Sequence, residues 1–399
     1  MTFSYSVFFK ESNIEWGSRW DPYIESGDTN IHWFSIIICF ACIICLIAIT
    51  IQILGRTLKS DIESYIRIGR HESSFSTYID TGWKLLKNDV FIHPKTGLLL
   101  CSIVGIGVQL VIMLFITFVT CFFGIISPER RGGMVTIMIF LYIFLSLIGG
   151  LSQSFLAKSM KYNFNECTLA TIMSFFIPSI IFGLYFILNL LLWISNSSGV
   201  VPLNIVIIVI ILWIGILYPL AIVGTYIGAR FCIEDGPPYV SAKVSRNHYK
   251  KRWYHNWFFV SLGGIIPFIS IFLELRNIMI SIWGEYYFVL FGFLCLVLIS
   301  LVILCGCISI ASTYLLLNTG NPYWWWRSFW VSGSSGIYVM IFAIFYYAQE
   351  IKAPMGITTI LYFGHMLAIS GLITIIAGTI GFLASFIFVK KIYSLIKSD

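Results

Sequence analysis

The sequence predicts an all-α, polytopic integral membrane protein built as a bundle of nine transmembrane helices. Hydrophobic residues make up 58% of the 399 residues. Charged residues make up only 11%, against about 25% in soluble domains. Nine apolar runs are each long enough to cross a bilayer as a helix, which takes about 20 residues. This composition excludes a soluble enzyme, a nucleic-acid-binding module and a disordered chain, and the absence of short alternating strands excludes a membrane β-barrel.

The nine runs follow one another along the chain. They cover residues 33–54, 98–125, 135–157, 169–193, 203–228, 258–280, 287–316, 330–349 and 357–389. The second, seventh and ninth runs exceed the thickness of the hydrocarbon core, so we expect these helices to tilt or to extend beyond it. Pro178, Pro219 and Pro267 lie inside runs and should interrupt their helices, because proline lacks the N–H of a regular inner turn.

The runs divide the chain into three parts. Residues 1–31 form a short segment before the first span, residues 32–389 form the nine-helix domain, and residues 390–399 form a tail. The first part is polar and lacks the basic start of a cleavable signal peptide. We therefore expect either that the first span acts as its own insertion signal or that the chain is the membrane part of something longer.

The basic residues predict the orientation. Of the 25 Lys and Arg residues, 19 fall on one side of the predicted spans, in residues 56–95, 158–161 and 230–252, at Arg327 and in the tail. The positive-inside rule places this side in the cytosol, so the N-terminus should be lumenal and the C-terminus cytosolic. The net charge of +7 is therefore a topology signal and not a nucleic-acid signature. Membrane lipids are the partners that it implies.

Three ionisable residues form a candidate intramembrane polar site: Glu274, Arg276 and His365. Glu274 and Arg276 are two positions apart on a helix, so their side chains diverge and cannot pair with each other. Glu274 either accepts a hydrogen bond from a hydroxyl on a neighbouring helix or takes part in transport or conformational switching. His365 has the same alternatives, of which packing with a satisfied ring is favoured.

Neutral polar and small residues predict close helix packing. Gln109, Gln153 and Asn189 should form hydrogen bonds between helices. Gly224, Gly228, Gly378 and Gly381 should let helix backbones approach each other.

No constellation typical of a membrane enzyme is found. All seven aspartates lie in loops or tails, which excludes an intramembrane aspartyl protease, and no H-E-x-x-H zinc motif occurs. The G-x-S-G at Gly333–Gly336, with His365 one span later, resembles a rhomboid-type serine protease, but the small residues that should follow the histidine are missing. A cysteine triplet beginning at Cys39 is a possible soft-metal site or, more simply, helix packing. We expect no catalytic residue, no metal and no cofactor.

A series of motifs along nearly the whole chain resembles one family. Its markers are Trp16, Trp20 and Asp21 before the first span, Gly82 and Trp83 in the first loop, and Trp325, Trp326 and Arg327 before the eighth span. The order of these motifs resembles the nonaspanins, the transmembrane 9 superfamily. The resemblance covers the family's membrane portion, without most of the lumenal domain that precedes it in family members.

The resemblance implies a Golgi and endosomal membrane protein. Such a protein acts in the trafficking, sorting and membrane localisation of other transmembrane proteins, its clients, especially those with glycine-rich spans. The chain ends Lys397-Ser398-Asp399, which is similar to the family's signal for the COPI coat, so Lys397 and Asp399 are the candidate sorting signal. The alternative function is a transporter or channel with a polar path near Glu274.

Overall fold

The computed structural model describes most of the predicted membrane domain. It covers residues 90–125, 133–160, 164–231, 257–283, 291–351 and 356–394, apart from Lys95 and Ser198, together with isolated positions between residues 5 and 86. The helices of the continuous ranges are α3 (Gly97–Phe122), α4 (Gly133–Ser159), α5 (Glu166–Thr171), α6 (Ile177–Ile194), α7 (Leu203–Leu212), α8 (Tyr218–Phe231), α9 (Trp257–Leu262), α10 (Ile265–Trp283), α11 (Phe291–Asn318), α12 (Trp325–Gly333), α13 (Ser335–Tyr346) and α14 (Ile357–Ser394). Three π-helical segments join them, η3 (Ile172–Phe176), η4 (Trp213–Leu217) and η6 (Tyr347–Ile351).

The predicted all-α membrane class is confirmed. No strand occurs in the described ranges, and seven helices there are long and apolar enough to cross a membrane. The run at 258–280 is represented by a shorter apolar stretch, Val260–Phe272, which is divided between α9 and α10. The run at 33–54 is described only at isolated positions. The count of nine spans therefore stays a prediction.

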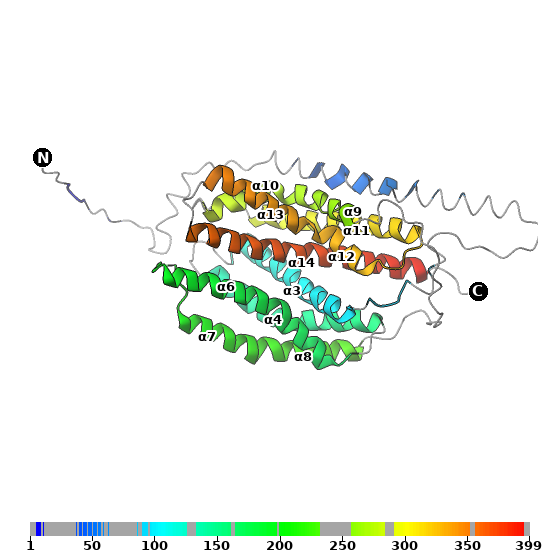
Figure 1. Ribbon diagram of the computed structural model, residues 1–399, viewed down its shortest axis with the longest axis horizontal. Coiled ribbons are helices and arrows are strands. Elements are labelled where there is room, and N and C mark those ends of the chain that lie inside the picture. Colours follow the sequence, from blue (N-terminus) through cyan, green and yellow to red (C-terminus); the bar gives the residue numbers. More distant parts are fainter. Residues whose placement is uncertain are drawn as a thin grey trace, which may run out of the picture.

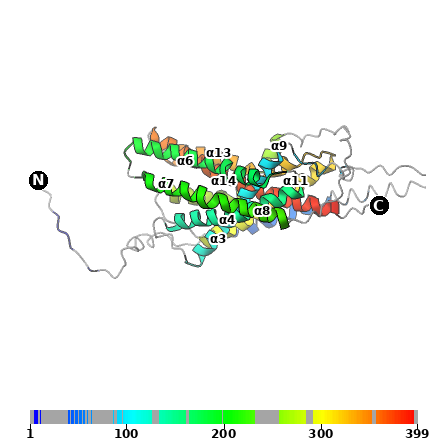
Figure 2. The ribbon, with the colours of Figure 1, turned by 90° about the horizontal axis from the view of Figure 1, so that it is seen from below.

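Two central helices hold the bundle together. Helices α3 and α14 pack against each other, with the α4–α8 lobe on one side and the α9–α13 lobe on the other (Figure 1). Helices α7 and α8 lie on the outer side of the α4–α8 lobe (Figure 2). Successive spans alternate in direction, so Lys158, Arg230 and Lys391 in the last turns of α4, α8 and α14 lie at one end of the bundle. We call this end the basic end.

The three inner prolines alter the helices that contain them, as predicted. Pro178 follows η3 and Pro219 follows η4, so each of these helices widens into a π-helical turn just before its proline. Pro267 follows the break between α9 and α10 at Gly263 and Gly264. A proline leaves the carbonyl four residues earlier without its usual donor. For Pro178 that carbonyl belongs to Ser174, and it accepts the indole N–H of Trp213 from η4 at 2.9 Å.

Small residues bring the helices together around α14. A side chain at Gly381 would collide with the hydroxyls of Ser309 on α11 and Ser332 on α12, which are hydrogen-bonded to each other. One turn further along α14, Ser385 accepts a hydrogen bond from Thr313 of α11 at 3.1 Å. Buried hydroxyls that bond across helices stabilise bundles in lipid, where no water can replace their partners.

The other predicted glycines and the two glutamines also lie at contacts between neighbouring helices. Gly224 and Gly228 lie directly against the backbone of α4. Gln153 of α4 donates to Thr225 of α8 at 2.8 Å, and Gln109 of α3 donates to the carbonyl of Tyr142 on α4 at 2.6 Å. These contacts confirm that the glutamines and glycines join neighbouring helices. For Asn189 the prediction was wrong, because its side chain bonds the main chain of Val201 in the turn before α7.

Candidate functional site

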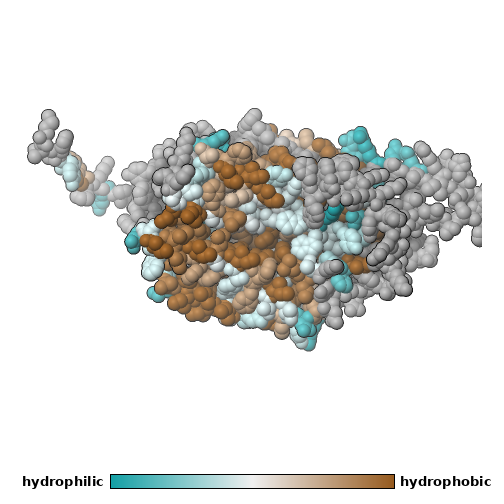
Figure 3. Space-filling view, viewed as in Figure 1, coloured by the Kyte–Doolittle hydropathy of each residue, from teal (hydrophilic) through white to brown (hydrophobic). Residues whose placement is uncertain are grey.

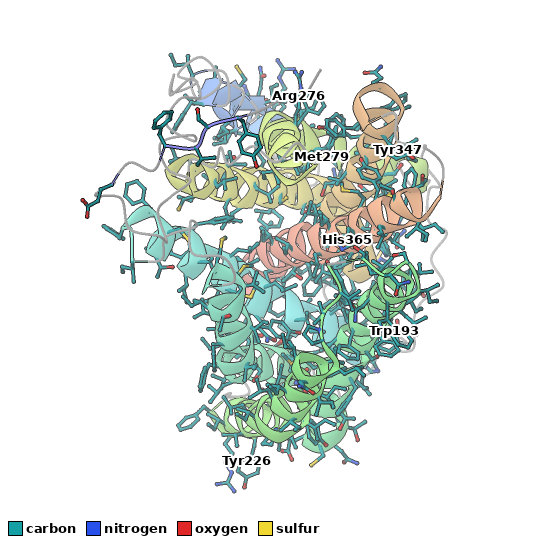
Figure 4. All side chains as sticks on the ribbon, turned by 90° about the vertical axis from the view of Figure 1, so that its left-hand side faces the viewer. Trp193, Tyr226, Arg276, Met279, Tyr347 and His365 are labelled. Atoms are coloured by element: carbon teal, nitrogen blue, oxygen red, sulfur yellow. The ribbon has the colours of Figure 1, made fainter. Side chains whose placement is uncertain are left out.

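Two of the three predicted ionisable residues, Arg276 and His365, lie on different helices. Arg276 is exposed on α10, whereas His365 lies on α14, between Tyr347 and Trp193 in the end-on view of Figure 4. Glu274 lies on α10, but its side chain lies outside the described part of the chain. A polar path near Glu274 therefore stays a prediction.

His365 is held by local packing. Its Nδ1 lies 2.7 Å from the carbonyl oxygen of Leu361, one turn earlier on α14. Its ring meets the ring of Tyr185 on α6 edge to face, with 5.5 Å between centroids. These are the contacts expected of a packing histidine. Ser335 of the G-x-S-G run is fully buried, and its hydroxyl has no hydrogen-bond partner among the described residues, so it does not pair with His365.

The tryptophan motif forms a clamp at the basic end. The indole N–H groups of Trp324 and Trp325 donate to the carbonyls of Val90 and Ile92, at 3.0 and 2.9 Å. Trp326 donates to the hydroxyl of Thr96 at 2.9 Å. Three consecutive indoles thus bind one segment just before α3: two donate to main-chain carbonyls and the third to a side-chain hydroxyl. We call this arrangement the indole clamp.

The clamp sits in a layered aromatic core. Trp324 and Trp325 stack with 4.2 Å between ring centroids, and Trp324 stacks in turn on Phe382 of α14. Phe91 meets Tyr393, near the end of α14, edge to face at 5.8 Å. Buried aromatic rings contribute both area and preferred geometry. The clamp therefore ties the start of α3, the start of α12 and the end of α14 together.

The remaining motif residues lie mostly outside the described part of the chain. Arg327 is half-buried in the first turns of α12, next to the clamp. The described residues do not include Trp16, Trp20, Asp21, Gly82, Trp83, Lys397 and Asp399.

Two helix interruptions meet inside the α9–α13 lobe. The carbonyl of Ser261, at the end of α9, accepts hydrogen bonds from the hydroxyls of Ser334 at 2.9 Å and Tyr338 at 3.1 Å. Ser334 lies in the short link between α12 and α13. It also packs against Gly264, where any side chain would collide with it. The break between α9 and α10 is thus bound to the break between α12 and α13.

One side of α14 is open to the surroundings. Ile360 and Leu367 are 52% and 54% exposed, and Gly371 is also exposed. Positions seven and four residues apart lie on one side of a helix. Apart from its chain neighbours and the adjoining backbone of α14, no atom lies within 4 Å of the position that a side-chain carbon at Gly371 would take. We call these three residues the α14 face.

The α14 face has helices on both sides. Helices α6 and α13 each pack against α14 but make no extensive contact with each other. In the most apolar window of the span Glu166–Ile194, which contains α6, only 6% of the residues are buried. In the corresponding window of the span that contains α14, 56% are buried. Figure 3 shows the resulting apolar surface over the region of α6, α7 and α14. The arrangement can accept another apolar helix or lipid chains.

Sequence reasoning missed both features. It singled out charged residues, because charges inside a membrane are costly, whereas the clamp uses neutral indoles and the α14 face uses apolar residues. Three adjacent tryptophans were a visible signal for the clamp, but nothing in the sequence indicated their partners. Gly371 has no local signal that separates it from the buried Gly378 and Gly381.

Comparison with known proteins agrees with the motifs. The family model described as endomembrane protein 70 matches residues 1–357. Transmembrane 9 superfamily member 10 of Arabidopsis thaliana and transmembrane 9 superfamily member 4 of Homo sapiens are each 38% identical to the chain over its whole length. The chain spans 62% and 61% of the length of these two relatives. No solved structure matches it significantly. The chain thus belongs to the endomembrane protein 70 family, the family of the transmembrane 9 superfamily proteins.

Proposed function

We propose that this protein binds transmembrane helices of other membrane proteins and acts, without catalysis, in their sorting and membrane localisation in the Golgi and endosomes. Family membership supports an integral membrane protein, and the α14 face is the observation that carries the proposal. Its clients are membrane proteins with glycine-rich spans. Its further partners are membrane lipids and, through Lys397 and Asp399, the COPI coat.

The α14 face suits a glycine-rich helix for a steric reason. Inside a bilayer no hydrophobic force drives helices together, so association depends on close van der Waals packing, which small residues permit. Ile360 and Leu367 project from the face, and client glycines would leave room for them. The open Gly371 would in turn receive a larger client side chain. Lipid chains would also cover the face, but they would not depend on the client's glycines.

Photo-crosslinking from the face tests the proposal. A photoreactive amino acid at Leu367 is compared with one at Ile207, an exposed residue of α7. The co-expressed target is a membrane protein with either its glycine-rich span or the same span with glycines replaced by leucine. We expect Leu367 to capture the glycine-rich form several-fold better than the leucine form and Ile207 to capture neither preferentially. Equal capture of both forms from Leu367, or capture of lipid alone, would contradict the proposal.

A Gly371→Leu variant extends the test. The open space at this position means that the larger residue should not disturb folding. We expect it to reduce capture of the glycine-rich target. Unchanged capture would show that the helix binds elsewhere.

A transporter is the second candidate. The observation that favours it is the meeting of two interrupted helices, because transporters place substrate sites at broken helices near the middle of the membrane. Ion or proton flux in proteoliposomes, abolished by Glu274→Gln, would support it. Flux that is absent, or unchanged in the variant, would argue against this role.

A further inference from the structure

The hairpin formed by α6 and α7 is joined to the bundle through two π-helical segments. Segment η3 precedes α6 and segment η4 follows α7, so neither helix continues into the bundle as a regular α-helix. Pro178 and Pro219 stand just beyond these segments on their C-terminal sides. A π-helical turn is a local rearrangement of the hydrogen-bond ladder, and such turns often mark functional positions.

The two π-helical segments are in contact. The indole of Trp213 in η4 donates to the Ser174 carbonyl in η3 and stacks on Phe175, with 5.6 Å between ring centroids. Tyr218, just after η4, lies 3.2 Å from Thr171, just before η3, hydroxyl oxygen to hydroxyl oxygen. The carbonyl that Pro178 leaves free is therefore held by a side chain of the neighbouring helix.

Burial of the helices differs on the two sides of the contact between η3 and η4, which we call the junction. Toward the basic end, α8 buries Ala221, Gly224, Thr225, Gly228 and Ala229. On the other side, α7 buries no residue and α6 buries only Leu188. The hairpin beyond the junction is thus attached far more weakly than the helix that continues from it.

The hairpin is also tied together at its own turn. The side chain of Asn189 on α6 accepts from the main-chain N–H of Val201 at 2.8 Å and donates to its carbonyl at 3.2 Å. The hairpin's contacts with α14 include an apolar one, Leu188 against Gly364, and a ring contact, Tyr185 against His365. The two helices are therefore built to stay together when they leave α14.

We propose that residues 177–212 tilt as one unit about the paired π-helical segments. The tilt separates α6 from α14 and widens access to the α14 face. The carbonyl of Ser174 keeps its indole partner during the tilt, because that bond lies at the pivot. This motion belongs to the protein alone and does not rest on the proposed function.

Distance measurements in lipid nanodiscs test the motion without any partner. Spin-labelled unnatural amino acids leave the ten native cysteines in place. One pair joins the exposed residues Ile205 on α7 and Ile341 on α13, and a control pair joins Tyr226 on α8 and Ile387 on α14. We expect a broad or two-component distance distribution for the first pair and a narrow one for the control. A first pair as narrow as the control would overturn the proposal.

Two proline variants test the pivot. Alanine at Pro178 restores a main-chain N–H donor for the Ser174 carbonyl, which makes the helix more regular at the pivot. Pro178→Ala should therefore narrow the distribution of the Ile205–Ile341 distance. Pro202→Ala, at the turn before α7 and away from the pivot, is the matched control and should not change it. Equal effects of the two changes would overturn the assignment of the pivot.

A cross-link tests the closed state. The Cγ of Leu188 lies 3.2 Å from the position of a side-chain carbon at Gly364, so cysteines introduced at these two positions should form a disulfide. Oxidation should leave only the component of the Ile205–Ile341 distance distribution in which α6 lies against α14. Reduction should restore the second component. A distribution that stays broad in the cross-linked protein would show that label motion, and not the hairpin, causes the breadth.

Discussion

Trp324 donates its indole N–H to the main-chain oxygen of Val90, 3.0 Å away and 234 residues earlier in the chain. Trp324 is fully buried. A buried carbonyl that loses its donor in an apolar core costs more than the hydrogen bond itself contributes. The indole clamp therefore contributes strongly to the stability of the basic end.

Trp324→Phe should destabilise the protein by about 1–3 kcal/mol, because phenylalanine keeps an aromatic ring but leaves the buried carbonyl of Val90 unpaired. Thermal unfolding in detergent measures the loss. The matched control is Trp326→Phe, whose hydrogen bond to Thr96 is exposed, so that water can replace the indole. Equal shifts for the two variants would refute the role assigned to burial.

Gly381→Ala should also destabilise the bundle, by about 1–3 kcal/mol, since overfilling a packed core forces side chains and backbone apart. The added methyl group would collide with the hydroxyls of Ser309 and Ser332. Gly371→Ala on the same helix is the control and should change the unfolding midpoint little, because its surroundings are open. Should both variants unfold at the wild-type temperature, the close packing at Gly381 would be disproved.

Glu274 gives a prediction from the sequence alone. A carboxylate exposed to lipid would cost on the order of 2–3 kcal/mol, so we expect it to face the bundle interior and to form a hydrogen bond. Glu274→Gln should then be expressed and folded better than Glu274→Leu. Equal yields of monodisperse protein for the two variants would indicate that the residue lies in interfacial water.

The turn between α6 and α7 gives a test of orientation. It contains the sequence Asn196-Ser197-Ser198, a glycosylation sequon, directly after α6 ends at Ile194. We expect no glycan there, because the turn is short and its backbone is held by hydrogen bonds such as Asn196 to Trp193. A flexible insert with its own sequon after Gly199 should be glycosylated if this end is lumenal. An unmodified insert, together with modification of an insert at the basic end, would reverse the predicted topology.

The tail gives a prediction about location. Changing both Lys397 and Asp399 to alanine should move the protein from the Golgi toward endosomes or the cell surface, because the paired charges are the proposed coat signal. The control changes Lys390 and Lys391, which adjoin the end of the last span. This variant should stay in the Golgi. A double Lys397/Asp399 variant that stays in the Golgi would show that the tail is not the retention signal.

The sequence was most informative where one residue type has one physical effect. Prolines inside apolar runs predicted disturbed helices, and Pro178, Pro219 and Pro267 each mark one. Local chemistry did not predict which form the disturbance takes, since that depends on a neighbour such as Trp213 being able to bind the freed carbonyl.

Contacts between segments that are distant in the sequence could not be predicted, for a different reason. The carbonyl of Val90 is chemically the same as any other, so nothing in the sequence marks it as the partner of Trp324. Likewise Gly371 and Gly381 have similar local sequences, and only the arrangement of neighbouring helices makes one open and the other crowded. Long-range geometry decides both cases.

The indole clamp also has a consequence for biosynthesis. A ribosome adds about 5–20 residues per second, so the 234 residues that separate Val90 from Trp324 take roughly 10–50 s to make. During that interval α3 has entered the membrane while the carbonyls of Val90 and Ile92 still lack their indole donors. The basic end is therefore completed only after α12 emerges, and a nascent chain halted before residue 324 would leave these two carbonyls without their indole donors.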